Sequence, residues 1–184
     1  MLDEARQALS EMIEEYAGRF PDEAVTCERL IQFVRSHADC FSRKCQAGHV
    51  TSSAWLFDTE RKRVLLTHHK KLDIWVQLGG HMEGESFVLE SALREAREES
   101  GIEGIRACSE ALFDIDIHEI PQRGQNAAHL HYDCRFAFQT ETSDAFQLTE
   151  ESHELRWVEV GKVKALTDEA SVLRMVEKSA ALSS

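Results

Sequence analysis

No stretch of this 184-residue chain approaches the roughly 20 consecutive apolar residues that a membrane-spanning helix needs, so we expect no membrane partner. The chain also lacks the basic start and apolar core of a secretory signal, because it opens with the acidic, amphipathic stretch MLDEARQALSEMIEEY. We therefore expect a cytoplasmic protein. Its length and its apolar content of 42% predict one hydrophobic core.

The spacing of the cysteines and the small number of basic residues argue against disulfide-rich, zinc-knuckle and nucleic-acid-binding proteins. The five cysteines are odd in number and lack CxxC spacing, which argues against a disulfide framework and a zinc knuckle. Lysine and arginine together number 21 against 33 aspartates and glutamates, which gives a net charge of −12. This charge repels phosphate backbones, so we expect no long nucleic acid as partner. An anionic small molecule would need a metal ion as a bridge.

The first part of the chain has the periodicity of two helices, from Leu2 to about Ser36, interrupted within GRFPDE. Gly18 is expected to end the first helix and Pro21 to begin the second. The first helix carries an apolar stripe, which needs either the rest of the chain or the second subunit of a homodimer to cover it. The stripe comprises Leu2, Ala5, Leu9, Met12, Ile13 and Tyr16. We assign residues 1–45 to a helical extension and residues 46–184 to the main domain.

After the extension, strand patterns surround one amphipathic helix. We predict a hairpin of residues 50–58 and 63–69, then strands over 73–78, 112–120, 129–140 and 154–160. A closing helix is expected from about Asp168 to Ala180. The amphipathic helix runs from about Phe87 to Ser100 and is stopped by Gly101.

Negative charge gathers on one flank of this helix, where Glu95, Glu98 and Glu99 follow one another at spacings of three and four residues. Like charges at these spacings destabilise an isolated helix by about 0.2–0.5 kcal/mol per pair, so the cluster favours a bound cation. Arg94 and Arg97 supply part of the countercharge. A solvated face of glutamates and arginines is the alternative interpretation.

The order of residues from Gly80 to Ile102 resembles the Nudix box. In that motif a glycine, five residues, a glutamate and seven residues precede Arg-Glu-aliphatic-x-Glu-Glu-x-Gly-aliphatic. The matching positions after the loop are Arg94, Glu95, Ala96, Glu98, Glu99, Gly101 and Ile102. Ser86 departs from the motif because it stands where the box has a glutamate, and Glu85 lies one position early. The flanking segments VLLTHHKKLDIWVQLGGH, HLHYDCRF and ESHELRWV also resemble bacterial Nudix hydrolases.

The resemblance implies an α/β fold of the Nudix type, an α/β/α sandwich around a mixed β-sheet, with the N-terminal helices as an addition. It also implies hydrolysis of the diphosphate linkage in a small nucleoside diphosphate derivative, such as a nucleotide sugar, a dinucleoside polyphosphate or a modified nucleotide. Glu95, Glu98 and Glu99 would hold Mg²⁺, or Mn²⁺ in its place, because hard cations prefer oxygen ligands. Arg94 would orient these carboxylates.

Three further residues are candidates for the site. Gly80, which we assign to substrate binding, lets the backbone turn tightly and approach the metal site, although a simple turn before a helix is the alternative. His81 follows it and is expected to contact phosphate. Glu151 precedes a late strand, where the resemblance implies an additional catalytic carboxylate that binds metal or activates water.

A second group of polar residues lies within HLHYDCRF, where strict alternation places His129, His131, Asp133 and Arg135 on one face of a strand. We interpret this face as a wall that binds substrate, with Arg135 available to phosphate. An ordinary solvent-facing strand is the alternative. The pair His129 and His131 could also bind zinc, with His118 or Asp133 as the third ligand.

Two other functions remain open from the sequence. A Nudix-fold module that binds a nucleotide or regulates without turnover is the alternative, motivated by Ser86 and the N-terminal helices. Isomerase chemistry on an isoprenoid diphosphate is the third, although we can place no acid-base pair for it. Phosphate release with and without Mg²⁺ separates hydrolysis from binding.

Overall fold

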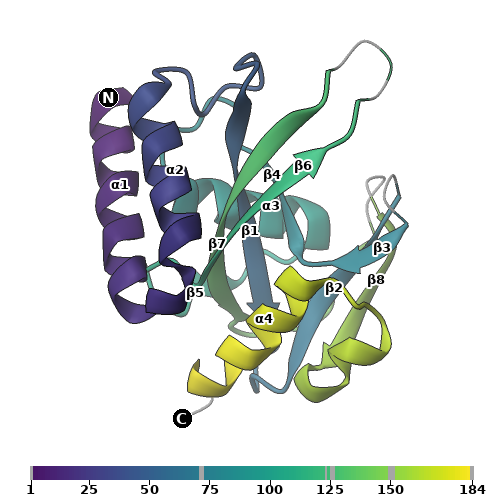
Figure 1. The fold of residues 1–184 in the computed structure, drawn as a ribbon. Coiled ribbons are helices and arrows are strands. Elements are labelled where there is room, and N and C mark those ends of the chain that lie inside the picture. The colour runs from purple at the N-terminus through teal and green to yellow at the C-terminus, as the bar shows by residue number, and fades with distance from the viewer. Residues whose placement is uncertain (1, 71–72, 123, 125–126, 149–151, 183–184) are drawn as a thin grey trace.

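The computed structural model of the chain describes residues 2–70, 73–122, 124, 127–148 and 152–182 (Figure 1). Its α-helices are α1 (Leu2–Arg19), α2 (Ala24–Ser36), α3 (Val88–Ser100) and α4 (Ala170–Ser179). Short 3-10 helices occupy Pro21–Glu23, Val160–Ala165 and Ala180–Leu182. The strands are β1 (Gly48–Phe57), β2 (Arg63–His69), β3 (Ile74–Val76), β4 (Leu78–His81), β5 (Ile105–Ala107), β6 (Asp114–Ile120), β7 (His129–Thr140) and β8 (Ser152–Glu159). Within these described residues, no helix has the length and apolar character that crossing a membrane requires.

The strands form one mixed sheet of eight. Its centre is the parallel pair β1 and β7, which runs in register from Gly48 beside Leu130 to Phe57 beside Gln139. The other strand pairs of the described chain are antiparallel. β4 and β2 share the second edge of β1, and β6 and β5 share the second edge of β7. The predicted mixed sheet and the hairpin of β1 and β2 are therefore confirmed.

Helices cover both faces of this sheet (Figure 1). On one face, Val50 and Leu56 of β1 belong to a hydrophobic cluster that also contains buried residues of α1, α2 and α3. On the other face, Trp55 and Phe57 pack in a second cluster with Met175 of α4. Alternate residues of a strand point to opposite faces, so β1 contributes to both clusters. This arrangement is the predicted α/β/α sandwich.

The N-terminal helices pack on the rest of their own chain. Leu9, Ile13 and Tyr16 of α1 are buried in the same cluster as the sheet. Phe33 of α2 stacks on Tyr132 of β7, with ring centroids 3.9 Å apart and an angle of 7° between the planes. Apart from Leu2, which is 54% exposed, the apolar stripe of α1 is thus covered within the chain, as the first of the two alternatives requires. The predicted boundary between residues 45 and 46 falls just before β1.

Two elements differ from the prediction. The expected strand over residues 73–78 is two strands, because β3 pairs with β2 while β4 pairs with β1, and the chain changes partner at Gln77. The three-residue strand β5 was not predicted, since so short a segment has no readable alternation.

Candidate active site

The motif helix α3 is fixed to the sheet by its small and apolar residues. Val88, Ala92 and Ala96 are buried against the sheet, as the predicted amphipathic pattern requires. The helix ends at Gly101, which has a left-handed φ of 67°, and the Gly101 amide donates to the Arg97 carbonyl at 2.8 Å. This packing directs the glutamate-bearing flank of α3 towards β4.

Two consecutive glycines let the backbone of β4 meet that flank. A Cβ atom on Gly80 would lie 2.6 Å from Oε1 and 2.7 Å from Oε2 of Glu95. The Gly79 amide donates a hydrogen bond of 2.8 Å to Oε1 of Glu99. Gly79 has a φ of 152°, and a Cβ atom there would lie 2.7 Å from the carbonyl oxygen of Ser52. Side chains at either position would therefore separate β4 from the carboxylates or from β1.

The three motif glutamates differ in burial. The residues Glu95 and Glu99 are each only 7% exposed, whereas Glu98 is exposed. Glu98 directs Oε2 at the Arg94 guanidinium, 2.7 Å from Nη1. A metal ion bound by all three carboxylates would therefore share Glu98 with Arg94.

Arg94 is the centre of the carboxylate cluster. Its guanidinium lies 3.0 Å from Glu85, 3.1 Å from Glu95 and 2.7 Å from Glu98, and it donates to the His81 carbonyl at 2.9 Å. Burial opposes the charge of Arg94, but the hydrogen bond to Glu85 and the charge of Glu95 outweigh it and raise the pKa of the guanidinium. These contacts suit the predicted role of orienting the carboxylates.

The departure from the motif at Ser86 has a structural counterpart in Glu85. The Glu85 carboxylate reaches Arg94 from the loop before α3, so it joins the cluster through the arginine. Three carboxylates around one guanidinium leave net negative charge, which a divalent cation would balance. Their hard oxygen atoms also match the ligands that Mg²⁺ prefers. The predicted catalytic residue Glu151 lies outside the described residues.

The predicted wall of β7 lies on the opposite face of the sheet, towards α4. Its two histidines are partly exposed, and the structure adds three more imidazoles from neighbouring strands. This histidine cluster consists of His49 on β1, His81 on β4, His118 on β6, and His129 and His131 on β7. Adjacent residues of β4 therefore contact two different groups. Gly80 contacts Glu95 of the carboxylate cluster, while His81 belongs to the histidine cluster.

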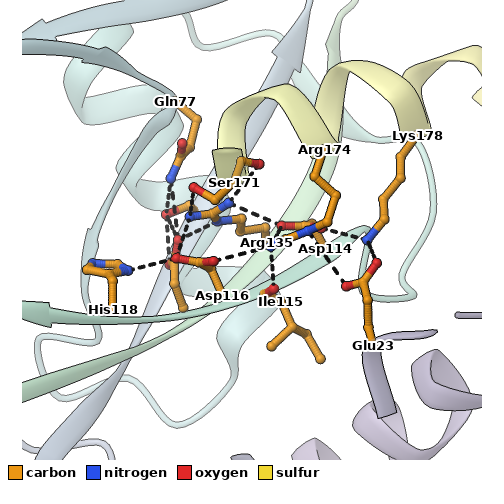
Figure 2. Close-up of polar contacts among 12 residues, drawn as sticks. Glu23, Gln77, Asp114, Ile115, Asp116, His118, Arg135, Ser171, Arg174 and Lys178 are labelled. Atoms are coloured by element: carbon orange, nitrogen blue, oxygen red, sulfur yellow. Dashed lines mark hydrogen bonds and ion pairs between the residues drawn. The ribbon is translucent and has the colours of Figure 1, made fainter. Parts of the chain in front are cut away.

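Asp133 and Arg135 are buried and paired with each other, and Figure 2 shows Arg135 among its other partners. Asp133 accepts hydrogen bonds from Thr51 at 3.0 Å, Ser53 at 2.8 Å and Arg135 at 2.7 Å. The Arg135 side chain is 2% exposed and also contacts Asp114 at 3.1 Å. A phosphate would have to enter the interior to reach it. The expectation that Arg135 is available to phosphate does not match this placement.

The same ion-pair network extends to the N-terminal helices. Arg174 and Lys178 of α4 contact Asp114 at 2.8 Å and 2.6 Å, and Lys178 also lies 2.6 Å from Glu23 (Figure 2). The Tyr16 hydroxyl donates to Glu23 at 2.5 Å. The network thus links the sheet beneath the histidines to α4 and to the segment between α1 and α2.

Sequence reasoning missed His49. It lies level with His131 in the parallel pairing of β1 and β7, with ring centroids 4.7 Å apart. Burial lowers the pKa of His49 to about 4, and the charge of nearby His129 acts in the same direction. Burial and the neighbouring imidazoles lower the pKa of His131 to about 2. Both rings are therefore neutral near pH 7.

Comparison with known proteins agrees with this architecture. The family model described as NUDIX domain matches residues 48–178, which is most of the chain. No curated protein sequence matches the chain.

Solved structures share the fold. A hydrolase of the NUDIX family from Clostridium perfringens has 27% identity and a TM-score of 0.53, covering 73% of this chain and 97% of its own. The E. coli dihydroneopterin triphosphate pyrophosphohydrolase has 19% identity and a TM-score of 0.57, covering 70% and 92%. The C. elegans Ap4A hydrolase has 16% identity and a TM-score of 0.55, covering 73% and 98%. Since the family model spans well over half of the sequence, this chain belongs to the Nudix family of pyrophosphate hydrolases, as its motif predicts.

Proposed function

We propose that this chain hydrolyses the diphosphate linkage of a small nucleoside diphosphate derivative, using Mg²⁺, or Mn²⁺ in its place, held by Glu95, Glu98 and Glu99. The observation that carries the proposal is the contact of the buried Glu95 carboxylate with Gly80, beside the hydrogen bond from Gly79 to Glu99. Two carboxylates thus lie at a strand whose glycines carry no side chain to block an approaching phosphate.

The chemistry follows from the donors of this site. When bound, a divalent ion stabilises charge on phosphoryl oxygens and lowers the pKa of a coordinated water. Arg94 acts as a positioning residue, because its contacts with Glu85, Glu95 and Glu98 hold these carboxylates on one side of α3. Such preorganisation limits the rearrangement needed when the ion binds.

We assign the substrate's other groups to the side of β4 that carries His81. His129 and His131 lie near it, with their imidazole rings partly exposed. Asp133 and Arg135 support this face from below through their buried ion pair. In this proposal, Gly80 and His81 connect the phosphate end of the substrate to the histidine face.

Hydrolysis is tested with a panel of substrates in the presence and absence of Mg²⁺. Two structurally similar proteins are named for dihydroneopterin triphosphate and Ap4A, so the panel includes a pterin triphosphate and dinucleoside polyphosphates. Nucleotide sugars and oxidised nucleotides complete it. Metal-dependent release of phosphate or of a nucleotide is expected from at least one class. Binding of a panel member without any cleavage would instead support the regulatory module.

The assignment of the metal ligands is tested with Glu98→Gln, which removes one charged ligand while keeping the size of the side chain. We expect kcat to fall at least about tenfold at saturating Mg²⁺, since even changes around metal ligands cost 10–100-fold. The matched control is Glu90→Gln, an exposed position on the same helix. Activity of Glu98→Gln equal to that of the control would contradict the assignment.

A further inference from the structure

The histidine cluster gathers five of the nine histidines of the chain on one face of the sheet. The ring centroids of His49 and His131 are 4.7 Å apart, and those of His49 and His129 are 5.0 Å apart. The His81 ring lies 5.0 Å from His49 and 5.1 Å from His131. The cluster thus brings together imidazoles from four different strands.

Part of this cluster is buried without hydrogen-bond partners. His49 is only 3% exposed, and neither of its ring nitrogens has a partner among the described residues. Among the described residues, the Nε2 atom of His131 is likewise buried and has no hydrogen-bond partner. A buried polar atom without a partner costs about 1–3 kcal/mol, so three such atoms at one place favour the binding of a ligand there.

Three of the histidines have the geometry of a metal site. One ring nitrogen from each of His49, His129 and His131 lies within 4.8 Å of the other two. Ligands of a tetrahedral zinc ion at 2.0–2.1 Å lie about 3.4 Å from one another, so side-chain rotations that bring the three nitrogens closer together would complete the site.

A supporting hydrogen bond prepares the third ligand. His129 Nδ1 lies 2.9 Å from the carbonyl oxygen of Ala127, so the ring donates this proton to the backbone and presents Nε2 with its lone pair. A backbone carbonyl on the second ring nitrogen is a common partner of metal-binding histidines, because it fixes both the tautomer and the ring orientation.

From this arrangement we infer that His49, His129 and His131 bind a zinc-class ion, at a site separate from the carboxylates of α3. Imidazole nitrogen suits Zn²⁺ and related transition metals, whereas Mg²⁺ prefers oxygen. The two sites lie on opposite faces of β4, since Gly80 contacts Glu95 and His81 contacts the histidines. Three protein ligands leave a fourth position for water or an anionic group. The inference does not depend on the proposed hydrolysis.

Binding is tested by titrating metal-free full-length protein with Zn²⁺ in a calorimeter, with millimolar Mg²⁺ present to saturate oxygen sites. We expect one equivalent of Zn²⁺ to bind, and we expect Co²⁺ in its place to give the visible absorption of a nitrogen-bound ion. The melting temperature should rise with Zn²⁺, because an ion that binds only the folded chain stabilises it. No binding above the level of buffer would overturn the inference.

The ligands are tested with His129→Ala, because this side chain is partly exposed and its removal leaves the core intact. We expect Zn²⁺ affinity to fall by more than about tenfold, since the loss of a ligand exceeds the loss of a supporting contact. His153→Ala, at an exposed histidine outside the cluster, is the matched control and should bind as the wild type does. Equal affinity in both variants would overturn the inference. Loss of Zn²⁺ binding in Glu98→Gln would also overturn it, by placing the ion at the carboxylates.

Discussion

The carboxylate of Glu95 lies directly against the Cα of Gly80, so that any Cβ atom on this strand residue would come within 2.7 Å of both carboxylate oxygens. This contact joins the helix of the motif to the strand before it. The hydrogen bond from Gly79 to Glu99, 2.8 Å long, holds a second carboxylate at the same strand. The spacing of the motif thus has a physical reason, since one side chain at position 80 would force Glu95 away.

Gly80→Ala should therefore disturb the site more than the fold. The backbone at position 80 is not left-handed, so alanine is compatible with the strand itself. Its methyl group would collide with Glu95 and displace the carboxylate. We expect kcat to fall at least about tenfold, as for other changes around a metal ligand, while circular dichroism stays unchanged.

The control for this variant is Gly18→Ala. A Cβ atom on Gly18 meets nothing within 4 Å, and the residue lies within α1. Alanine is favoured over glycine within a helix by roughly 0.5–1 kcal/mol, so this variant should be slightly more stable and equally active. Unimpaired turnover in Gly80→Ala would show that the position of Glu95 does not limit the reaction.

Glu85→Gln tests how the loop before α3 compensates for Ser86. The Glu85 carboxylate holds Arg94 at 3.0 Å, and Arg94 also binds Glu98 at 2.7 Å. Without the charge of Glu85, the arginine would attract Glu98 and Glu95 more strongly and compete with the metal ion. We expect the Mg²⁺ concentration for half-maximal activity to rise, measured by metal titration at saturating substrate.

Ser86→Glu is the companion variant, because it restores the residue that the motif has at this position. The added carboxylate should lower the half-maximal Mg²⁺ concentration or leave it unchanged. A Glu85→Gln enzyme with the wild-type metal dependence would mean that the glutamates of α3 suffice, and the compensating role of Glu85 would be rejected.

Much of the motif region could be predicted from the sequence because its determinants are local. The expected helix over residues 87–100 agrees with α3 to within one residue, since its apolar spacing and Gly101 both act over a few positions. The long strand β7 has the predicted bounds for the same reason, because its alternation extends over twelve residues.

Alternation within β7 places His129 and His131 on one face, but the place of His49 beside them could not be predicted because it depends on which strands pair. His49 and His131 are far apart in the chain and become neighbours only through the parallel register of β1 and β7. Similarly, the buried ion pair of Arg135 depends on the pairing of β6 with β7, which places Asp114 opposite Arg135 in the sheet. Alternation within one strand shows which residues share a face, but it does not show what covers that face.

Ile13→Ala tests whether the N-terminal helices are part of the core. The Ile13 side chain is fully buried in the cluster shared by α1 and the sheet. Its truncation should lower the free energy of unfolding by about 2–5 kcal/mol, because the removed atoms leave a cavity. Val25→Ala, at a position that is 73% exposed on α2, should change stability by no more than about 0.5 kcal/mol.

Deletion of residues 1–36 extends this test. The truncated chain would expose the face of β7 that carries Tyr132 and would lose the contact of Glu23 with Lys178. We expect aggregation, measured by light scattering during refolding. A truncated chain that stays monomeric, equally stable and fully active would show that the helices are dispensable.

Asp116 of β6 belongs to the ion-pair network, since its carboxylate lies 3.5 Å from Arg135 and 3.3 Å from Arg174, and it makes the stability of the fold depend on pH. Burial opposes its ionisation, but the hydrogen bond with His118 and the charge of Arg135 outweigh this effect and lower its pKa from 3.8 to about 2. A carboxyl group whose pKa is lower in the folded chain stabilises the fold when the pH is above its pKa in the unfolded chain. The contribution of Asp116 is therefore present above pH 3.8 and disappears as the pH falls towards 2. The shift corresponds to about 2 kcal/mol at neutral pH.

Asp116→Asn removes this titration, so the variant should be less stable than the wild type by about 2 kcal/mol at pH 6. The difference should shrink steadily between pH 4 and pH 2, because the wild-type carboxyl group then becomes protonated. Urea unfolding at a series of pH values measures both free energies. Asp168→Asn, at an exposed position, should follow the wild-type curve throughout. A stability difference for Asp116→Asn that stays constant with pH would assign the loss to packing rather than to the charge.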